Sequence, residues 1–346
     1  MLARVILTIA CILLLSGCAE LRYVTQASAG QEDINRRGIA IDEVVDQGLL
    51  DRRTRELLAH VPRIKAFGER HGLKKTKNYE RYVWLGRDAV VWVVTASSPL
   101  AFRPKVWSFP IVGSFTYEGW FDKNEARTYA ASLEAVGWDV DVRPSQAYST
   151  LGWFDDPILS TMIVKSQDAV GSLADVVLHE TLHATFYVRG QSTLNESVAS
   201  FFGDRLAVVY LDEALGPDSI EKRDFVAKRE RSERKAQRMH DAYVALEHLY
   251  ASHRPSQEVL AEKARITQAL RAELRLERPV NNASLIQYKT YGSGKAELDQ
   301  LLCACDGDFP RLLRHLDRVR ESAKAAPPHS DPAALLQPLL RETCSP

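Results

Sequence analysis

The chain has few cysteines and methionines, no net charge and, beyond its N-terminal segment, no long hydrophobic run. Its 346 residues include 5 cysteines and 3 methionines, and 45 basic residues balance 45 acidic ones. Because the charges cancel, the total does not indicate nucleic acid or another polyanion as a partner. The missing apolar run excludes a later membrane-spanning helix, which would need about 20 such residues. The remaining composition is that of a folded globular protein.

The first eighteen residues form a separate segment. Arg4 precedes an almost unbroken apolar run from Val5 to Leu15, which is short for a membrane span but typical of a secretory signal. The run ends in Leu15-Ser16-Gly17-Cys18, the pattern of a bacterial lipobox. We therefore expect residues 1–17 to be a lipoprotein signal peptide and Cys18 to be the lipidated first residue of the mature chain. A buried N-terminal helix or a plain secretory signal is the alternative.

The residues after Cys18 predict a location. Ala19 and Glu20 follow the cysteine, so no aspartate is present there as an inner-membrane retention signal. We expect a protein of the cell envelope, attached to the outer membrane of a Gram-negative cell by its N-terminal lipid and facing the periplasm.

Three cysteines remain after the lipobox: Cys303, Cys305 and Cys344. An odd number allows at most one internal pair. In an oxidising compartment, Cys344 is expected to pair with either Cys303 or Cys305.

The hydrophobic patterns predict a mainly helical α+β fold with a small sheet in the first half. We expect residues 18–346 to form a single domain, with a charged helical hairpin at about 219–278 and a linker with a short helix at 325–346. The expected elements, in order, are helices in 19–75, strands at 89–95, 110–117 and 138–142, a helix at 124–136, a loop at 148–162, and helices from 172 onward that include 220–274 and 295–324.

The motif His179-Glu180-Thr181-Leu182-His183 carries the chemistry. Two histidines four residues apart on a helix lie one turn from each other, so both imidazoles can bind one zinc ion. Glu180 lies about 100° further round the helix, where it can take a proton from a water at the metal. Ser172 with Asp175 predicts a capping box at the start of this helix, and Gly190 predicts its end.

Glu196 is the expected third ligand, because gluzincin peptidases place a glutamate near the start of a second, antiparallel helix. Ala199, Ser200 and Gly203 follow it at +3, +4 and +7, a stripe of small residues that would allow close packing on the first helix. Two alternatives stay open: Glu196 forms a capping box with Thr193, and the two histidines are ordinary core residues.

The chain resembles the bacterial putative aminopeptidase lipoproteins, a family of HExxH zinc metallopeptidases similar to gluzincins. The resemblance covers nearly the whole mature chain. Besides the lipobox, the HExxH motif and Asn195-Glu196-Ser197, it includes Val91-Trp92, Trp107 to Gly113, Ala147 to Met162, Asn281-Asn282-Ala283 and Tyr291.

The resemblance implies one zinc ion held by His179, His183 and Glu196, with Glu180 as general base acting on peptide substrates. Thirteen residues separate His183 from Glu196, a shorter interval than in thermolysin-like gluzincins, so a tight helical hairpin is expected. Ser200 stands where those enzymes place an aspartate, which leaves Asp204 as a candidate to hold a ligand histidine.

Two further roles are left open. Tyr291, Tyr288 and Tyr187 are candidates to stabilise the oxyanion, and Tyr291 has the resemblance behind it. An aminopeptidase also needs an anionic pocket for the free α-amino group, for which Glu118, Asp155 and Asp156 are candidates. The competing functions are an endopeptidase of the same mechanism and a non-catalytic zinc-binding envelope lipoprotein.

Overall fold

The computed structural model describes residues 23, 25–48, 50–109, 113–147, 155–290 and 292–344. Its contacts divide the chain into two compact units. The first unit takes the described parts of Met1–Arg37, Arg87–Gln146 and Arg238–Lys289, and the second those of Gly38–Gly86, Ala147–Gln237 and Thr290–Pro346. Each unit is thus built from segments distant in the sequence. The expectation of a single domain over residues 18–346 stays a prediction, which this division does not decide.

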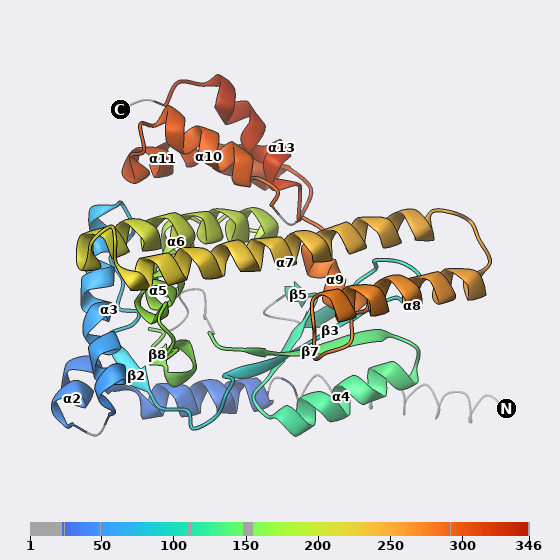
Figure 1. Ribbon diagram of the computed structural model, residues 1–346, viewed down its shortest axis with the longest axis horizontal. Helices are drawn as coiled ribbons and strands as arrows, with labels where there is room; N and C mark the ends of the chain where they lie inside the picture. The colour runs from blue at the N-terminus through green and yellow to red at the C-terminus, as the bar shows by residue number, and fades with distance from the viewer. Residues whose placement is uncertain are drawn as a thin grey trace. The chain divides into compact units, whose positions relative to one another are not determined.

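The first unit contains a three-stranded antiparallel sheet (Figure 1). Strand β3 (Val91–Ser97) lies in the centre, between β6 (Glu118–Trp120) and β7 (Asp139–Ser145). Helix α4 (Lys123–Ala135) packs against it and is capped by the preceding Asp122, whose carboxylate accepts hydrogen bonds from two backbone N–H groups. A separate hairpin pairs β4 (Trp107–Phe109) with β5 (Gly113–Phe115). The buried core between sheet and helix consists of Val94, Ala96, Trp107, Trp120, Ala126, Ala130, Leu133 and Val140.

The first unit also contains the expected helical hairpin. The C-terminal half of α7 (Ile220–Tyr250) packs against α8 (Ser256–Glu273), and Pro255 precedes the second helix. Two short elements follow, α9 (Asn282–Leu285) and the 3-10 helix η2 (Ile286–Tyr288). The side-chain amide of Asn282 is fully buried and donates to the Ser98 carbonyl oxygen at 2.8 Å, which fixes α9 beside the sheet.

The second unit has a smaller sheet that was not expected from the sequence. Strand β2 (Arg81–Val83) pairs antiparallel with β1 (Ile39–Ala40) and parallel with β8 (Ile158–Leu159). Helix α2 (Ile41–Asp46) follows β1, and the 3-10 helix η1 (Ser160–Met162) follows β8. These strands have only two or three residues, too few for an alternating pattern to stand out.

Helix α3 (Arg52–Arg70) forms as the apolar spacing predicts. Asp51 accepts a hydrogen bond from the Thr54 backbone N–H at 3.1 Å and starts the helix. Gly68 brings α3 close to α5, because a Cβ at this position would lie 3.0 Å from a Leu178 methyl group. The buried face consists of Leu57, Leu58, Val61, Ile64 and Phe67, none more than 1% exposed.

Helices α5 (Ala169–Thr185) and α6 (Ser192–Leu215) form a tight antiparallel pair, as expected. Helix α6 runs beside the N-terminal half of α7 (Figure 1), to which the Asp212–Lys222 ion pair joins it. The predicted bounds of α5 were wrong at both ends. It begins three residues before Ser172, so Ser172 and Asp175 lie inside the helix, and it ends at Thr185, before Gly190.

The C-terminal region of the second unit is made of short helices rather than one long one. A disulfide joins Cys305 to Cys344, which confirms one of the two expected pairings, and Cys303 is free and exposed. The elements are α10 (Lys295–Ala304), α11 (Phe309–Leu316), α12 (Val319–Ala325), α13 (Pro332–Leu336) and the 3-10 helix η3 (Gln337–Arg341).

The mainly helical α+β class is confirmed. Within the described residues, none of the helices combines the length and the apolar character needed to cross a bilayer. Cys18 and the segment 1–17 lie outside the described residues.

Candidate metal centre

Helix α5 carries both histidines of the HExxH motif on one side. Its other sides are apolar and buried, so the helix is held in the core of the second unit by residues such as Leu173, Val177 and Leu182. The imidazole centroids of His179 and His183 lie 5.0 Å apart, the separation expected for successive turns of one helix.

The turn from α5 to α6 is fixed by Asn195, the residue before Glu196. Its side-chain amide accepts a hydrogen bond from the Val188 backbone N–H at 2.8 Å and donates to the Val188 carbonyl oxygen at 2.9 Å. Asn195 is only 1% exposed, so these two bonds satisfy a buried polar group. They also fix the first turn of α6, and with it the position of Glu196.

The C-terminal region of the chain holds the same turn from the other side. The Arg320 guanidinium donates to the carbonyl oxygens of Thr185 at 3.0 Å and Tyr187 at 2.9 Å, which satisfies the free C-terminal end of α5. The buried Gln191 amide donates to the carbonyl oxygens of Ala323 at 2.8 Å and Pro327 at 2.9 Å. The geometry of the α5–α6 pair therefore depends on residues more than 130 positions later in the chain.

Glu196 lies between the two histidines. Its Oε2 atom is 3.5 Å from His179 Nε2, and its Oε1 atom is 3.4 Å from His183 Nε2. One ligand atom from each of these three residues lies within 4.8 Å of the others, so the group can hold a metal ion. The alternative capping box is not formed, because α6 begins at Ser192 and Thr193 lies inside it.

The three side chains shift one another's pKa values. Burial lowers the pKa of His183, and the Glu196 carboxylate opposes this only in part, so the ring favours the neutral form that binds metal. Partial desolvation alone would raise the pKa of Glu196, but the two histidines outweigh it and hold the pKa below its ordinary value. Burial would lower the pKa of His179, yet Glu196, Glu180 and Asp175 raise it.

The group is open to solvent on one side. The side chain of Glu196 is 62% exposed, whereas His183 is 5% exposed. Within the described residues, the group that can hold a metal comprises these three side chains and no fourth. A substrate could therefore approach from the glutamate side.

Glu180 faces a buried tyrosine that the sequence analysis missed. Burial raises the pKa of Tyr79 well above its ordinary value, and the charges of Glu180 and Asp156 add to this effect. The Tyr79 backbone N–H donates to the Asp156 carbonyl oxygen at 2.7 Å, and its φ of 64° is left-handed, which is unusual for an aromatic residue. No motif marks Tyr79, so only the fold could reveal it.

The candidate acids for an α-amino pocket belong to different units. Asp156 is 2% exposed beside Tyr79, whereas Asp155 is exposed. Glu118 belongs to the first unit and is buried there. The structure does not bring these three carboxylates together in one unit.

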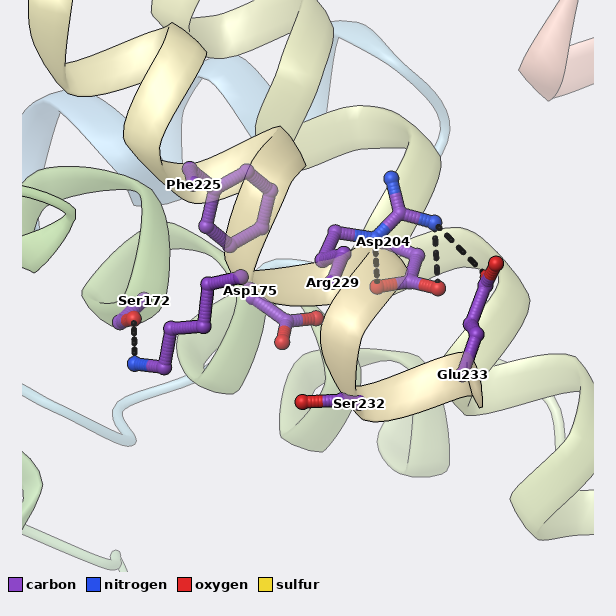
Figure 2. A pocket seen from close by; sticks show the side chains of 8 residues that line it. Ser172, Asp175, Asp204, Phe225, Arg229, Ser232 and Glu233 are labelled. Atoms are coloured by element: carbon purple, nitrogen blue, oxygen red, sulfur yellow. Dashed lines mark hydrogen bonds and ion pairs between the residues drawn. The ribbon is translucent and has the colours of Figure 1, made fainter. Parts of the chain in front are cut away.

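Asp204 has a partner other than a ligand histidine. It lies on α6 and forms an ion pair with Arg229 of α7 at 2.6 Å. Both line a pocket of about 250 Å³, shown in Figure 2, together with Ser172, Asp175, Phe225, Lys228, Ser232 and Glu233. The predicted role of Asp204 as the residue that holds a histidine receives no support from this contact.

The two described tyrosine candidates belong to different units. Tyr187 lies on the α5–α6 connection and is 43% exposed, and Tyr288 belongs to the first unit. Tyr291 lies outside the described residues.

Comparison with known proteins gives one match. A family described as "Putative aminopeptidase" matches residues 22–328, which is most of the chain. No curated protein and no solved structure matches.

Proposed function

We propose that this chain, which belongs to the putative aminopeptidase family, is a zinc-dependent peptidase that uses Glu180 as its general base. Family membership supports peptidase chemistry. The position of Glu196, with one carboxylate oxygen near each histidine Nε2, is the observation that carries the zinc proposal.

The distances support zinc as the ion. Ligands about 2.0–2.1 Å from a tetrahedral zinc lie roughly 3.4 Å from one another. The two nitrogen–oxygen separations of 3.5 and 3.4 Å match this value and exceed the usual 2.7–3.2 Å of an N–H···O hydrogen bond. His179, His183 and Glu196 would hold the ion.

When bound, zinc would polarise the scissile carbonyl and lower the pKa of a water. The chain's own residues do the rest. Glu180 accepts a proton from the attacking water and delivers it to the leaving amine. The exposed side of Glu196 leaves room for the peptide.

The variant Glu180→Gln tests this mechanism. It keeps the size of the side chain but cannot take the proton, so kcat should fall by at least about 10²–10⁴-fold. Zinc content, measured by elemental analysis, should stay at the wild-type level, because Glu180 is not a ligand. Glu213→Gln on α6, an exposed glutamate paired with Arg70, is the matched control and should keep full activity. Wild-type turnover by zinc-loaded Glu180→Gln would remove Glu180 from the mechanism.

Substrate choice separates the remaining alternatives. Hydrolysis of peptides with a free N-terminus, but not of the same peptides with a blocked one, is expected of an aminopeptidase. Equal hydrolysis of both would indicate an endopeptidase. Zinc binding without hydrolysis of either would indicate a non-catalytic zinc-binding lipoprotein.

We also propose that the protein is anchored in the cell envelope, at the outer membrane and facing the periplasm, by a lipid on Cys18. The lipobox sequence supports this location. Mass spectrometry of the N-terminal peptide of the mature protein should find a diacylglyceryl group on Cys18. Cys18→Ser should release the protein from the membrane fraction.

A further inference from the structure

A partly buried carboxylate, that of Asp175, lies one helix turn before one of the two histidines. Asp175 precedes His179 by one turn of α5, so both side chains project from the same side of the helix. A Cβ built on Gly203 of α6 would lie 2.6 Å from Asp175 Oδ1 and 3.0 Å from His179 Cβ. The carboxylate and the base of the histidine therefore face the same point of α6, and only a glycine leaves space for them.

Asp175 is not neutralised by the basic side chains around it. Lys228 binds Asp168, and Arg229 binds Asp204. Among the described residues, no hydrogen bond or ion pair reaches the Asp175 carboxylate. It lines the pocket of Figure 2.

Asp175 is only partly buried, and His179 follows it one turn later on the same face of α5. A carboxylate without a protein partner among the described residues at this position favours a role toward His179.

We propose that Asp175 is a positioning residue for the metal centre: its carboxylate accepts the Nδ1 proton of His179 through a water in the pocket. The inference rests on the proposed function, since it assumes that His179 binds the ion through Nε2. A proton held on Nδ1 leaves the Nε2 lone pair free and keeps the ring turned toward Glu196.

His183 differs from His179 in that no carboxylate is proposed to hold its Nδ1 atom. Its Nδ1 atom is buried and has no partner among the described residues, so that side of the ring is held by packing. Of the two histidines, His179 is the more exposed, and it has the carboxylate behind it. The centre is thus asymmetric, with one ring fixed by the core and the other by a charge.

The test compares the zinc affinity of purified, full-length mature protein and its variants by competition with a chelator. Asp175→Asn and Asp175→Ala should both bind zinc about 10–100-fold more weakly than wild type, the usual cost of losing an outer partner. Asp204→Asn, which changes a carboxylate of the same pocket, is the matched control and should shift affinity by less than about 3-fold.

Thermal unfolding of the zinc-free proteins separates positioning from structure. Removal of a partly buried charge that has no protein partner within the described part of the chain should leave the Tm of zinc-free Asp175→Asn unchanged or higher. A fall in zinc affinity without a fall in Tm supports the proposal. Wild-type affinity in Asp175→Asn, or equal losses in Asp175→Asn and Asp204→Asn, overturns it.

The two proposals fail in different ways. If the wild type binds zinc but hydrolyses no peptide, the peptidase proposal is wrong. The affinity comparison still decides the role of Asp175. If the wild type hydrolyses peptides and Asp175→Asn keeps wild-type affinity, only the Asp175 proposal falls. A wild type that binds no zinc overturns both.

Discussion

Two antiparallel helix pairs of this protein are held together in different ways. In the second unit, α5 and α6 meet at Gly203, and the connection between them is fixed by buried hydrogen bonds from Asn195 and Gln191. In the first unit, the C-terminal half of α7 meets α8 through larger apolar side chains such as Leu246 and Leu270, with ion pairs on the exposed edge.

The difference follows from what each pair does. The α5–α6 pair brings together three side chains that can hold a metal ion, so the distance between its helices must be fixed to within a few tenths of an ångström. The α7–α8 pair only has to bury apolar surface, and most of this buried area is kept when an individual apolar side chain is exchanged for another. Substitutions in the two pairs should therefore have effects of different size.

The largest stability effect is expected at Gly203. Alanine is favoured over glycine in a helix by about 1 kcal/mol, yet its Cβ would meet a carboxylate at 2.6 Å and a backbone oxygen at 3.0 Å. Gly203→Ala should therefore destabilise the protein by about 1–3 kcal/mol, measured by urea unfolding. The reverse exchange in α8, Ala264→Gly at an exposed position, should cost only about 0.5–1 kcal/mol. Greater stability of Gly203→Ala than wild type would show that the helices need no close approach.

An intermediate effect is expected at Asp168, which precedes α5 and binds Lys228 and Ser172. Burial would raise its pKa, but these partners outweigh it and lower the pKa from 3.8 to about 2. The stabilisation is therefore present above pH 4 and lost as the pH falls toward 2. Because Lys228 is nearly half exposed, solvent screening reduces this stabilisation to about 1 kcal/mol.

Asp168→Asn should lower the Tm at pH 7 and differ less from wild type at pH 2.5. Thermal unfolding at several pH values measures this change. A stability difference that stays constant down to pH 2 would mean that the charge of Asp168 contributes nothing.

The smallest effect is expected at the exposed edge of the α7–α8 pair. Arg238 binds both carboxylate oxygens of Glu273, but both side chains are about half exposed. Arg238→Ala should change the Tm less than either substitution above, and the difference should shrink further as salt is added. A larger loss than in Gly203→Ala would reverse the comparison between the two pairs.

The sequence predicts those parts of the fold that repeat a pattern. The apolar face of α3, the break before α8 and the approach of Glu196 to both histidines all follow from spacing on regular helices. The predicted start of α5 was wrong because Ser and Asp favour helix starts but are also tolerated inside a helix. Ser172 there binds Asp168, and Asp175 faces a pocket.

Other parts depend on contacts between distant segments, which spacing cannot reveal. Tyr79 forms a hydrogen bond with Asp156, more than seventy residues later in the sequence, and Gln191 forms one with Ala323, more than one hundred residues later. The same reason left open whether Cys303 or Cys305 pairs with Cys344, since the two cysteines lie two residues apart.

The bonds from Arg320 and Gln191 to the α5–α6 turn have a consequence for biosynthesis. A ribosome that has translated two hundred codons has already made both histidines and the glutamate, but none of the carbonyl oxygens at 323 and 327 or the guanidinium at 320 that fix the turn. The nascent chain therefore carries the three candidate metal ligands before it carries the residues that fix their alignment. Loading of the proposed metal should be a late event, completed after the C-terminal segment has been synthesised and has folded back onto the turn.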